Sequence, residues 1–228
     1  MKSNQGKKPV VPCTREEMDA LINASIDSEF YEMLFKVARK TGRRLGEYYG
    51  IPEMKVIGKE TVYDKYGKPF EKEIKKKTNN FIDGVKVKDV DFGRKVMMTR
   101  VLKRRRKVEK EAILNDDLLQ LIQKYITRNG LKLDDYLFRG ITQKRPQGVS
   151  YRQVQNKVKS YAKKAGINHS VSFHNFRHFF VTELFKAGWS YDRIAKLTGH
   201  SSVGTLSIYD HTVASDIADE ARSAINNL

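Results

Sequence analysis

The chain has 228 residues, enough for one domain with a substantial buried core, and its 39% hydrophobic content with 11 Phe and 11 Tyr is that of a folded protein. No apolar run approaches the roughly 18 residues that a membrane-spanning helix needs, and the basic N-terminus lacks the apolar segment of a secretory signal. We therefore expect a protein that stays inside the cell, in the cytoplasm or nucleoid, away from membranes. The single cysteine, Cys13, has no companion cysteine, so neither a metal nor another cofactor is expected.

The formal charge of +17 favours a polyanionic partner, because nucleic acid gains affinity for a basic surface by releasing its condensed counterions. The charge is unevenly distributed, since residues 136–182 contain no Asp or Glu. The basic residues of that stretch are Arg139, Lys144, Arg145, Arg152, Lys157, Lys159, Lys163, Lys164 and Arg177. A surface kept basic only for solubility would normally mix both signs. The pattern therefore favours double-stranded DNA as the partner.

The first helices can be placed from their capping residues. Residues 1–13 are expected to form an N-terminal arm, and Thr14 and Glu17 then have the spacing of a capping box, which predicts a helix start. A second helix is expected after Asp27 or Ser28, and a glycine at position 42 ends it.

The middle of the chain changes character. From about residue 52 to 84 the sequence is charged and rich in turn residues, which predicts an insertion that forms an exposed hairpin or a mobile loop. Strand-like runs over 95–102 and 108–114 follow. They flank the cationic segment 103–107 and predict a hairpin with a basic tip.

Helical periodicity dominates the rest of the sequence. Helices are expected over 115–130, 150–166, 172–187, 190–197 and 213–226, with a further short helix before Tyr209. The predicted fold class is α+β, predominantly helical, with one small antiparallel sheet.

Three spaced motifs carry the candidate chemistry. They are Thr41-Gly42-Arg43-Arg44 with Glu47 three positions on, His174 with Arg177, and Gly199-His200 with Tyr209 nine residues after the histidine. In this order and spacing the motifs resemble the tyrosine recombinase (phage integrase) family. The resemblance covers most of the chain and implies that family's catalytic-domain fold.

The chemistry follows from the residue types. A phosphodiester attacked by a phenol gains negative charge on its nonbridging oxygens, and the forked guanidinium groups of Arg44 and Arg177 suit the stabilisation of that charge. The resemblance implies that Tyr209 attacks to give a 3'-phosphotyrosyl link, that His174 hydrogen-bonds and transfers a proton at the nucleophile, and that His200 donates to the phosphate.

The general acid of this family is a lysine at the tip of the sheet hairpin, and two residues fit. Lys103 follows a strand and is our choice, while Lys107 is the alternative because the turn is one residue longer than expected. Lys59 imitates the family's lysine phrase but comes too soon after Arg44. Arg43 stands where the family usually has an apolar residue, so it is expected to be structural or to contact DNA.

Further arginines are candidates for DNA contacts. Arg104, Arg105 and Arg106 at the hairpin tip are interpreted as general phosphate-binding residues, and Arg145 and Arg152 as further DNA contacts. The hairpin phrase over 101–114 also resembles integrases from archaeal mobile elements, of a virus or plasmid.

The remaining histidines have duller interpretations. His174 and His178 are spaced like a metal-binding pair, but position 175 is Asn and no third ligand is evident. We expect His178 to support the core, His169 to lie at the surface and His211 to make local hydrogen bonds.

The resemblance implies a site-specific recombinase or integrase that requires no cofactor. A type IB topoisomerase uses the same nucleophile, but that family generally has Lys where His174 stands. A DNA-binding remnant without turnover is the non-enzymatic alternative.

The resemblance also suggests a domain plan. We expect a catalytic domain over 14–212, with the insertion at about 52–84, and a C-terminal helix or tail over 213–228. Members of the family generally have a core-binding domain before the catalytic domain, so we expect an isolated catalytic fragment or a short member that binds DNA weakly. The free chain is expected to be a monomer, and a homotetramer is expected on DNA.

Overall fold

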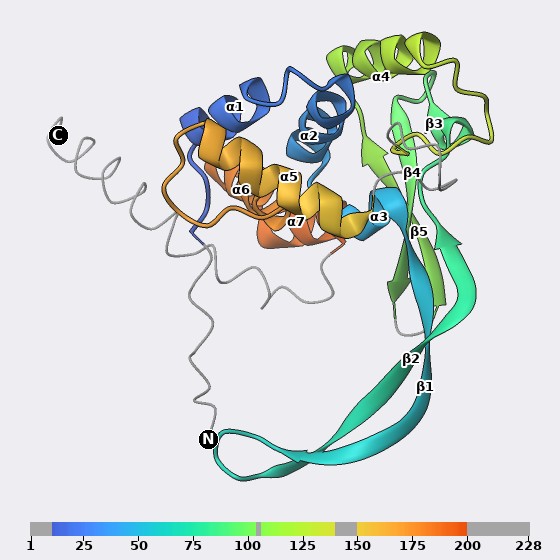
Figure 1. The fold of residues 1–228 in the computed structure, drawn as a ribbon, viewed down its shortest axis with the longest axis vertical. Coiled ribbons are helices and arrows are strands. Elements are labelled where there is room, and N and C mark those ends of the chain that lie inside the picture. Colours follow the sequence, from blue (N-terminus) through green and yellow to red (C-terminus); the bar gives the residue numbers. More distant parts are fainter. Residues whose placement is uncertain (1–10, 104–105, 140–149, 200–228) are drawn as a thin grey trace, which may run out of the picture.

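The structure is a computed structural model that describes residues 11–103, 106–139 and 150–199; along 51–56, 75, 77–82, 101–103 and 106–107 the description covers the backbone only. Helices dominate it (Figure 1). They are α1 (Arg15–Asn23), α2 (Glu29–Thr41), α3 (Leu45–Tyr49), α4 (Asp116–Arg128), α5 (Tyr151–Lys164), α6 (His174–Lys186) and α7 (Tyr191–Thr198). The strands are β1 (Gly50–Tyr63), β2 (Pro69–Asp83), β3 (Val90–Asp91), β4 (Val96–Lys103) and β5 (Arg106–Ile113).

Helix starts follow the capping chemistry of the sequence. Thr14 accepts from the amide of Glu17 while the Glu17 carboxylate accepts from the amide of Thr14, which completes the predicted capping box of α1. Ser150 begins α5 in the same way, and the Asn115 side chain accepts from the amide of Leu118 at the start of α4. These caps satisfy amide groups that a helix leaves without partners in its first turn.

The core of the helical body is aromatic. The Phe35 ring lies 5.1 Å from Phe176, and Phe176 lies 5.2 Å from Phe173, centroid to centroid. Tyr48 extends the cluster to Phe138, at 4.9 Å. Since these residues come from α2, α3, α6 and the segment after α4, one cluster fixes elements that are far apart in sequence.

A three-stranded antiparallel sheet, in the order β3-β4-β5, stands beside the helices (Figure 1). The β4–β5 pairing continues to Lys103 opposite Arg106, so only two residues remain for the turn. The basic tip is therefore shorter than the predicted segment 103–107, because ladder pairing extends to its flanks. Arg100 on β4 donates to both carboxylate oxygens of Asp89, at 2.6 and 2.8 Å, which ties the sheet to the 3₁₀ turn Val87–Asp89.

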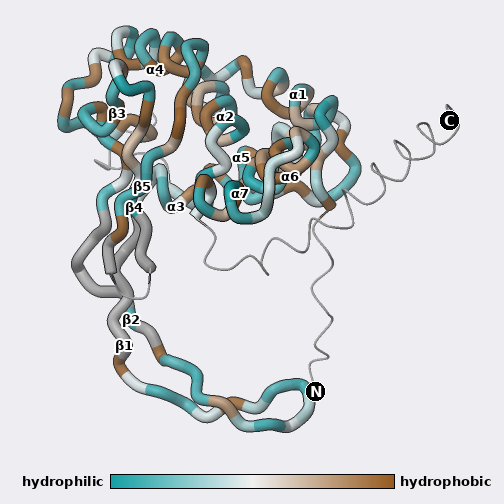
Figure 2. The backbone as a smooth tube through the Cα atoms, turned by 180° about the vertical axis from the view of Figure 1, so that it is seen from behind, coloured by the Kyte–Doolittle hydropathy of each residue, from teal (hydrophilic) through white to brown (hydrophobic). Residues whose placement is uncertain are grey.

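The predicted insertion is a long two-stranded arm. Strands β1 and β2 pair antiparallel from Gly50 opposite Asp83 to Tyr63 opposite Pro69, and the arm curves away below the body (Figure 1). Of the two predicted alternatives, the structure shows the exposed hairpin. In Figure 2 the coloured part of the arm is largely hydrophilic, whereas hydrophobic residues recur along the helices of the body. No helix among the described residues is long and apolar enough to cross a membrane.

The arm leaves and re-enters the body at a single point. Gly50 and Asp83 are paired, and a side chain at Gly84 would meet the carbonyl oxygen of Tyr48 at 2.5 Å, so α3 and the returning strand are in close backbone contact. The two strand ends at the root of the arm are therefore held together by contacts with the body, and these contacts do not involve the rest of the arm.

Excision of the arm should leave the body folded. Replacing residues 52–81 with Asn-Gly joins the paired residues Ile51 and Ile82 through a turn that suits a two-residue hairpin. Because a two-stranded ribbon adds little stability by itself, we expect the free energy of unfolding to change by no more than about 1 kcal/mol. Urea unfolding followed by circular dichroism measures this. Loss of a cooperative transition would show that the arm is part of the core.

Candidate active site

The first arginine box forms the corner between α2 and α3. Gly42 ends α2 in the left-handed conformation, with φ 59°, and a side chain there would meet the Phe180 ring at 2.3 Å. The Thr41 hydroxyl donates to the Val37 carbonyl at 2.8 Å and lies 2.6 Å from the Tyr48 hydroxyl. The corner needs glycine for both conformation and space, and the threonine holds it to both helices.

The two arginines of the box have opposite environments. Arg43 is 1% exposed, donates to the carbonyl of Glu111 on β5 and lies 3.8 Å from the Glu47 carboxylate. Burial lowers its pKa, which the neighbouring Glu47 charge opposes. The Arg44 side chain is 48% exposed and lies 3.4 Å from the other oxygen of Glu47. Arg43 is therefore structural, which is one of the two roles predicted for it, and Arg44 is the arginine that solvent or a ligand can reach.

Arg177 connects the three motifs. It lies in the first turn of α6, is 1% exposed, and its two terminal nitrogens donate to the carbonyls of Gly42 and Thr198, each at 3.0 Å. Gly42 belongs to the first arginine box, and Thr198 immediately precedes the Gly199 turn. One buried guanidinium thus brings together segments that are 135 and 21 residues away in sequence.

His174 lies one turn before Arg177, at the surface, with its ring edge-on to His178 at 4.6 Å between centroids. Partial removal from water, followed by the positive charges of Arg177 and Arg44, lowers its pKa. His178 is buried, as expected for a supporting residue, and burial lowers its pKa to about 4. Both rings are therefore neutral near pH 7. Arg44, His174 and Arg177 are close enough to interact electrostatically.

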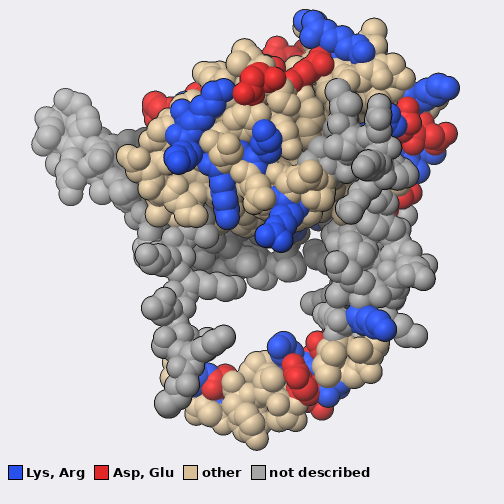
Figure 3. Space-filling model, viewed as in Figure 1, with Lys and Arg blue, Asp and Glu red and all other residues tan. Residues whose placement is uncertain are grey.

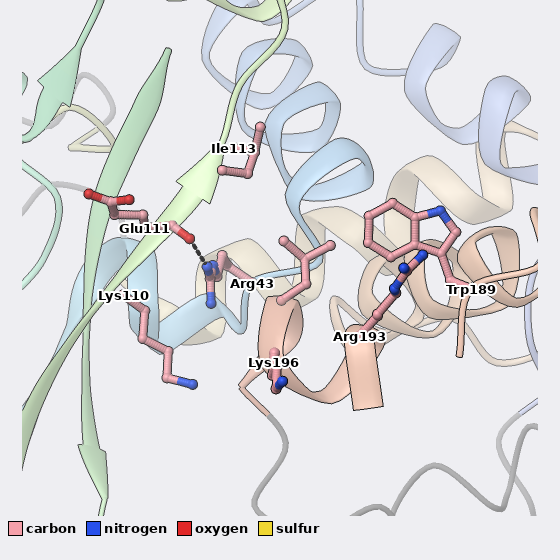
Figure 4. Close-up of a pocket in the computed structure, with 8 residues that line it drawn as sticks. Arg43, Lys110, Glu111, Ile113, Trp189, Arg193 and Lys196 are labelled. Atoms are coloured by element: carbon pink, nitrogen blue, oxygen red, sulfur yellow. Dashed lines mark hydrogen bonds between the residues drawn. The ribbon is translucent and has the colours of Figure 1, made fainter. Parts of the chain in front are cut away.

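A basic pocket of about 470 Å³ lies between β5 and α7 (Figure 4). Its cations are Arg43, Lys110, Arg193 and Lys196. The ammonium group of Lys110 approaches the backbone at Gly199, since a side chain there would meet it at 2.3 Å. Lys110 was not among the predicted site residues. Its position on β5, opposite Thr99, is set by strand pairing that the sequence does not state.

The other predicted site residues are placed in part. Lys103 ends β4, and Arg106 and Lys107 begin β5. For these three residues the structure describes the backbone only. Four more, namely Arg104, Arg105, Arg145 and His200, lie outside the described residues, as do Tyr209 and His211. Lys59 is on the arm, paired with Glu71, which agrees with its exclusion from the site.

Helix α5 borders the site. Arg152 is exposed in its first turn. Burial raises the pKa of the neighbouring Tyr151, and the positive charge of Arg44 opposes that shift, so this helix start lies within electrostatic range of the first arginine box. Lys and Arg side chains gather over α5 on the face in Figure 3. The helix contains no acidic residue, so this surface can meet a polyanion without local repulsion.

Solved structures share this architecture. The XerA recombinase superposes with a TM-score of 0.68 at 19% identity, covering 97% of this chain and 67% of that one. The XerH site-specific recombinase bound to palindromic difH substrate, a post-cleavage complex, gives 0.64 at 17% identity and covers 96% and 55%. The fold is therefore that of a tyrosine recombinase catalytic domain.

The family itself is shown by sequence. The model described as "Phage integrase family" matches residues 82–215, more than half of the chain, and the chain belongs to that family. A tyrosine recombinase of Pseudothermotoga lettingae is 33% identical over 115 residues, which are 50% of this chain and 37% of the relative. The matched segment thus spans little more than a third of that curated relative. The resemblance of residues 101–114 to archaeal elements stays a prediction.

Replacement of Arg177 by Lys should destabilise the fold, because one ammonium group cannot bond both carbonyls as the guanidinium fork does. Leaving buried polar groups unsatisfied costs about 3 kcal/mol. Thermal and urea unfolding measure the loss. Arg152→Lys is the matched control: the residue is exposed, and the free energy of unfolding should stay within about 0.5 kcal/mol of wild type. Equal effects of the two substitutions would contradict a linking role for Arg177.

Proposed function

We propose that this chain is a site-specific DNA recombinase or integrase that breaks and rejoins strands through a 3'-phosphotyrosyl intermediate. The observation that carries the proposal is the convergence of the first arginine box, the start of α6 and the Gly199 turn on the Arg177 guanidinium. The charges of Arg177 and Arg44 both act on His174, which supports a shared site for the three residues. Family membership supports the same function.

In the proposed reaction the phenol oxygen of Tyr209 attacks phosphorus. The bond to the 5'-oxygen breaks, and the DNA strand becomes attached through its 3'-phosphate. Arg44, Arg177 and His200 stabilise the negative charge that develops on the nonbridging oxygens. His174 accepts the phenol proton, a task that suits a neutral imidazole with a lowered pKa.

The leaving 5'-oxygen takes a proton from Lys103, with Lys107 as the alternative donor. Attack by a 5'-hydroxyl of another strand reverses the steps and releases Tyr209. Each step exchanges one phosphodiester for another, so no cofactor enters the proposal.

The partner in this proposal is double-stranded DNA. Exposed cations on α5, including Arg152, offer phosphate contacts near Arg44, and the hairpin-tip residues Arg104, Arg105 and Arg106 and the loop residue Arg145 are proposed to add more. A monomer in solution that assembles as a homotetramer on DNA follows from the resemblance. We propose the domain limits as 14–212 for the catalytic unit, with the arm as its insertion, and 213–228 as a C-terminal helix.

Tyr209→Phe should abolish covalent attachment, because phenylalanine lacks the attacking oxygen. Nicked suicide duplexes that lose a short fragment after cleavage trap the adduct, which denaturing electrophoresis detects. Wild type should form it and the variant should not, at equal DNA affinity. Strand exchange between two duplexes would then separate a recombinase from a type IB topoisomerase. A wild-type chain that binds these duplexes without forming an adduct would indicate a DNA-binding remnant.

The two candidate lysines can be separated by the chemistry of the leaving group. A 5'-bridging phosphorothioate leaves as a thiolate and needs little protonation, so it should restore cleavage to a variant that lacks only the general acid. We expect Lys103→Ala to be defective on ordinary DNA and rescued on the phosphorothioate, while Lys107→Ala is close to wild type on both. Rescue of Lys107→Ala instead would exchange the two assignments, and Tyr209→Phe serves as the control that sulfur cannot rescue.

A further inference from the structure

Three side chains with metal-binding atoms meet near the start of α6, and none of them is among the residues proposed for catalysis. They are Cys13, just before α1, Glu17 in the first turn of α1, and His169 in the loop between α5 and α6. The sulfur, a carboxylate oxygen and an imidazole nitrogen all lie within 4.8 Å of one another. These donors come from segments about 150 residues apart, so only the fold brings them together.

The spacing suits a tetrahedral ion. The Nε2 atom of His169 lies 3.1 Å from the Oε2 atom of Glu17. Two ligands that each bind zinc at about 2.0–2.1 Å, with a tetrahedral angle between them, are about 3.3 Å apart. The histidine and the carboxylate therefore already have almost the separation that a shared zinc ion requires, and sulfur at up to 4.8 Å would move about 1 Å closer to reach the roughly 3.6 Å of a zinc-bound pair.

Protein contacts satisfy the cluster only in part: the Oε2 atom of Glu17 accepts from the Thr14 amide at 2.9 Å and bonds the Nε2 atom of His169. The Nδ1 atom of His169 is buried and has no hydrogen-bond partner among the described residues. Cys13 is 6% exposed, and burial together with the Glu17 charge raises the pKa of its thiol to about 11. A divalent cation would reverse this situation, because it favours the thiolate and offsets the carboxylate charge. The thiol loses its proton to solvent when the metal–sulfur bond forms.

We propose that Cys13, Glu17 and His169 form a binding site for a zinc-class divalent ion. The mixed sulfur, nitrogen and oxygen donor set favours Zn²⁺ over Mg²⁺ or Ca²⁺, which prefer oxygen alone. Water fills the fourth position, since Glu17 and His169 are partly exposed. This inference goes beyond the proposed recombinase function and does not depend on it.

An ion at this site would stabilise the start of α6, the helix that carries His174 and Arg177. Asn175, in the first turn of α6, donates to the Val11 carbonyl at 2.9 Å and accepts from the amide of Ser172, also at 2.9 Å. The N-terminal segment and the loop before α6 therefore already touch at the turn that carries His174. An ion bound by Cys13 and His169 would join the same two segments, with no contact to reacting atoms.

The chain contains one cysteine, so thiol chemistry reports on this site alone. We expect saturating Zn²⁺ to slow alkylation of Cys13 in the wild-type chain by about tenfold or more, because the metal-bound thiolate is no longer available as a nucleophile. Equilibrium dialysis should give one tightly bound ion per chain. Co²⁺ in place of Zn²⁺ should give the charge-transfer absorption of a cobalt–thiolate bond and the visible bands of tetrahedral cobalt. If Zn²⁺ leaves the alkylation rate of the wild-type chain unchanged, the proposal is overturned by this experiment alone.

Substitutions identify the remaining ligands. Glu17→Gln retains a capping-box acceptor but removes the anionic ligand, and His169→Gln removes the imidazole, so each should weaken Co²⁺ binding by at least about tenfold. Glu16→Gln is the matched control, since Glu16 is an exposed carboxylate of the same helical turn and should leave affinity unchanged. Cobalt binding that survives Cys13→Ser at full affinity would place the ion elsewhere, for example at the His174–His178 pair, and would contradict the site. Circular dichroism without metal confirms that each variant is folded.

Discussion

The buried guanidinium of Arg177 is the constraint on which the arrangement of the site depends. A charged group that is 1% exposed must recover its lost hydration through hydrogen bonds, and two of these go to backbone carbonyls at the end of the α2 corner and at the end of α7. Because the partners are backbone carbonyls, the two bonds need no side-chain acceptor at these positions. They are sensitive to backbone position, because both bonds require the corner and the turn to stand at fixed distances from α6.

The α2–α3 corner shows how that position is enforced. Gly42 is in the left-handed conformation and against Phe180, so the corner cannot move away from α6 without losing a packed aromatic contact. Glu47, 2% exposed, lies near both arginines of the box. One carboxylate therefore stabilises the buried charge of Arg43 and also orients Arg44, which remains half exposed. The same corner carries the root of the arm, whose paired ends at Gly50 and Asp83 let the long hairpin leave and return without displacement of Arg44.

Much of this could be predicted where the signal is local. Capping residues such as Thr14, Asn115 and Ser150 mark helix starts because their side chains bond amides three residues on. The motif spacing identified the family. Helix α3 was missed because five residues are too few for a periodic pattern, and Lys110 was missed because strand pairing sets its approach to Gly199. His169 was expected at the surface and is partly exposed there, but its bond to Glu17 was not predicted, because the two residues lie 152 positions apart in sequence.

The electrostatics of the site connect substrate binding to the proposed base. Partial burial, followed by the positive charges of Arg177 and Arg44, lowers the pKa of His174 in the free protein. A phosphodiester bound at the exposed Arg44, beside the buried Arg177, would offset part of the positive charge that acts on His174, and the pKa of His174 would then rise. The imidazole would thus be a weaker base before DNA binds and a stronger one when the scissile phosphate is in place. In the proposed mechanism, the basicity of His174 would in this way depend on whether the phosphate position is occupied, because the Arg177 hydrogen bonds fix the α2–α3 corner relative to α6.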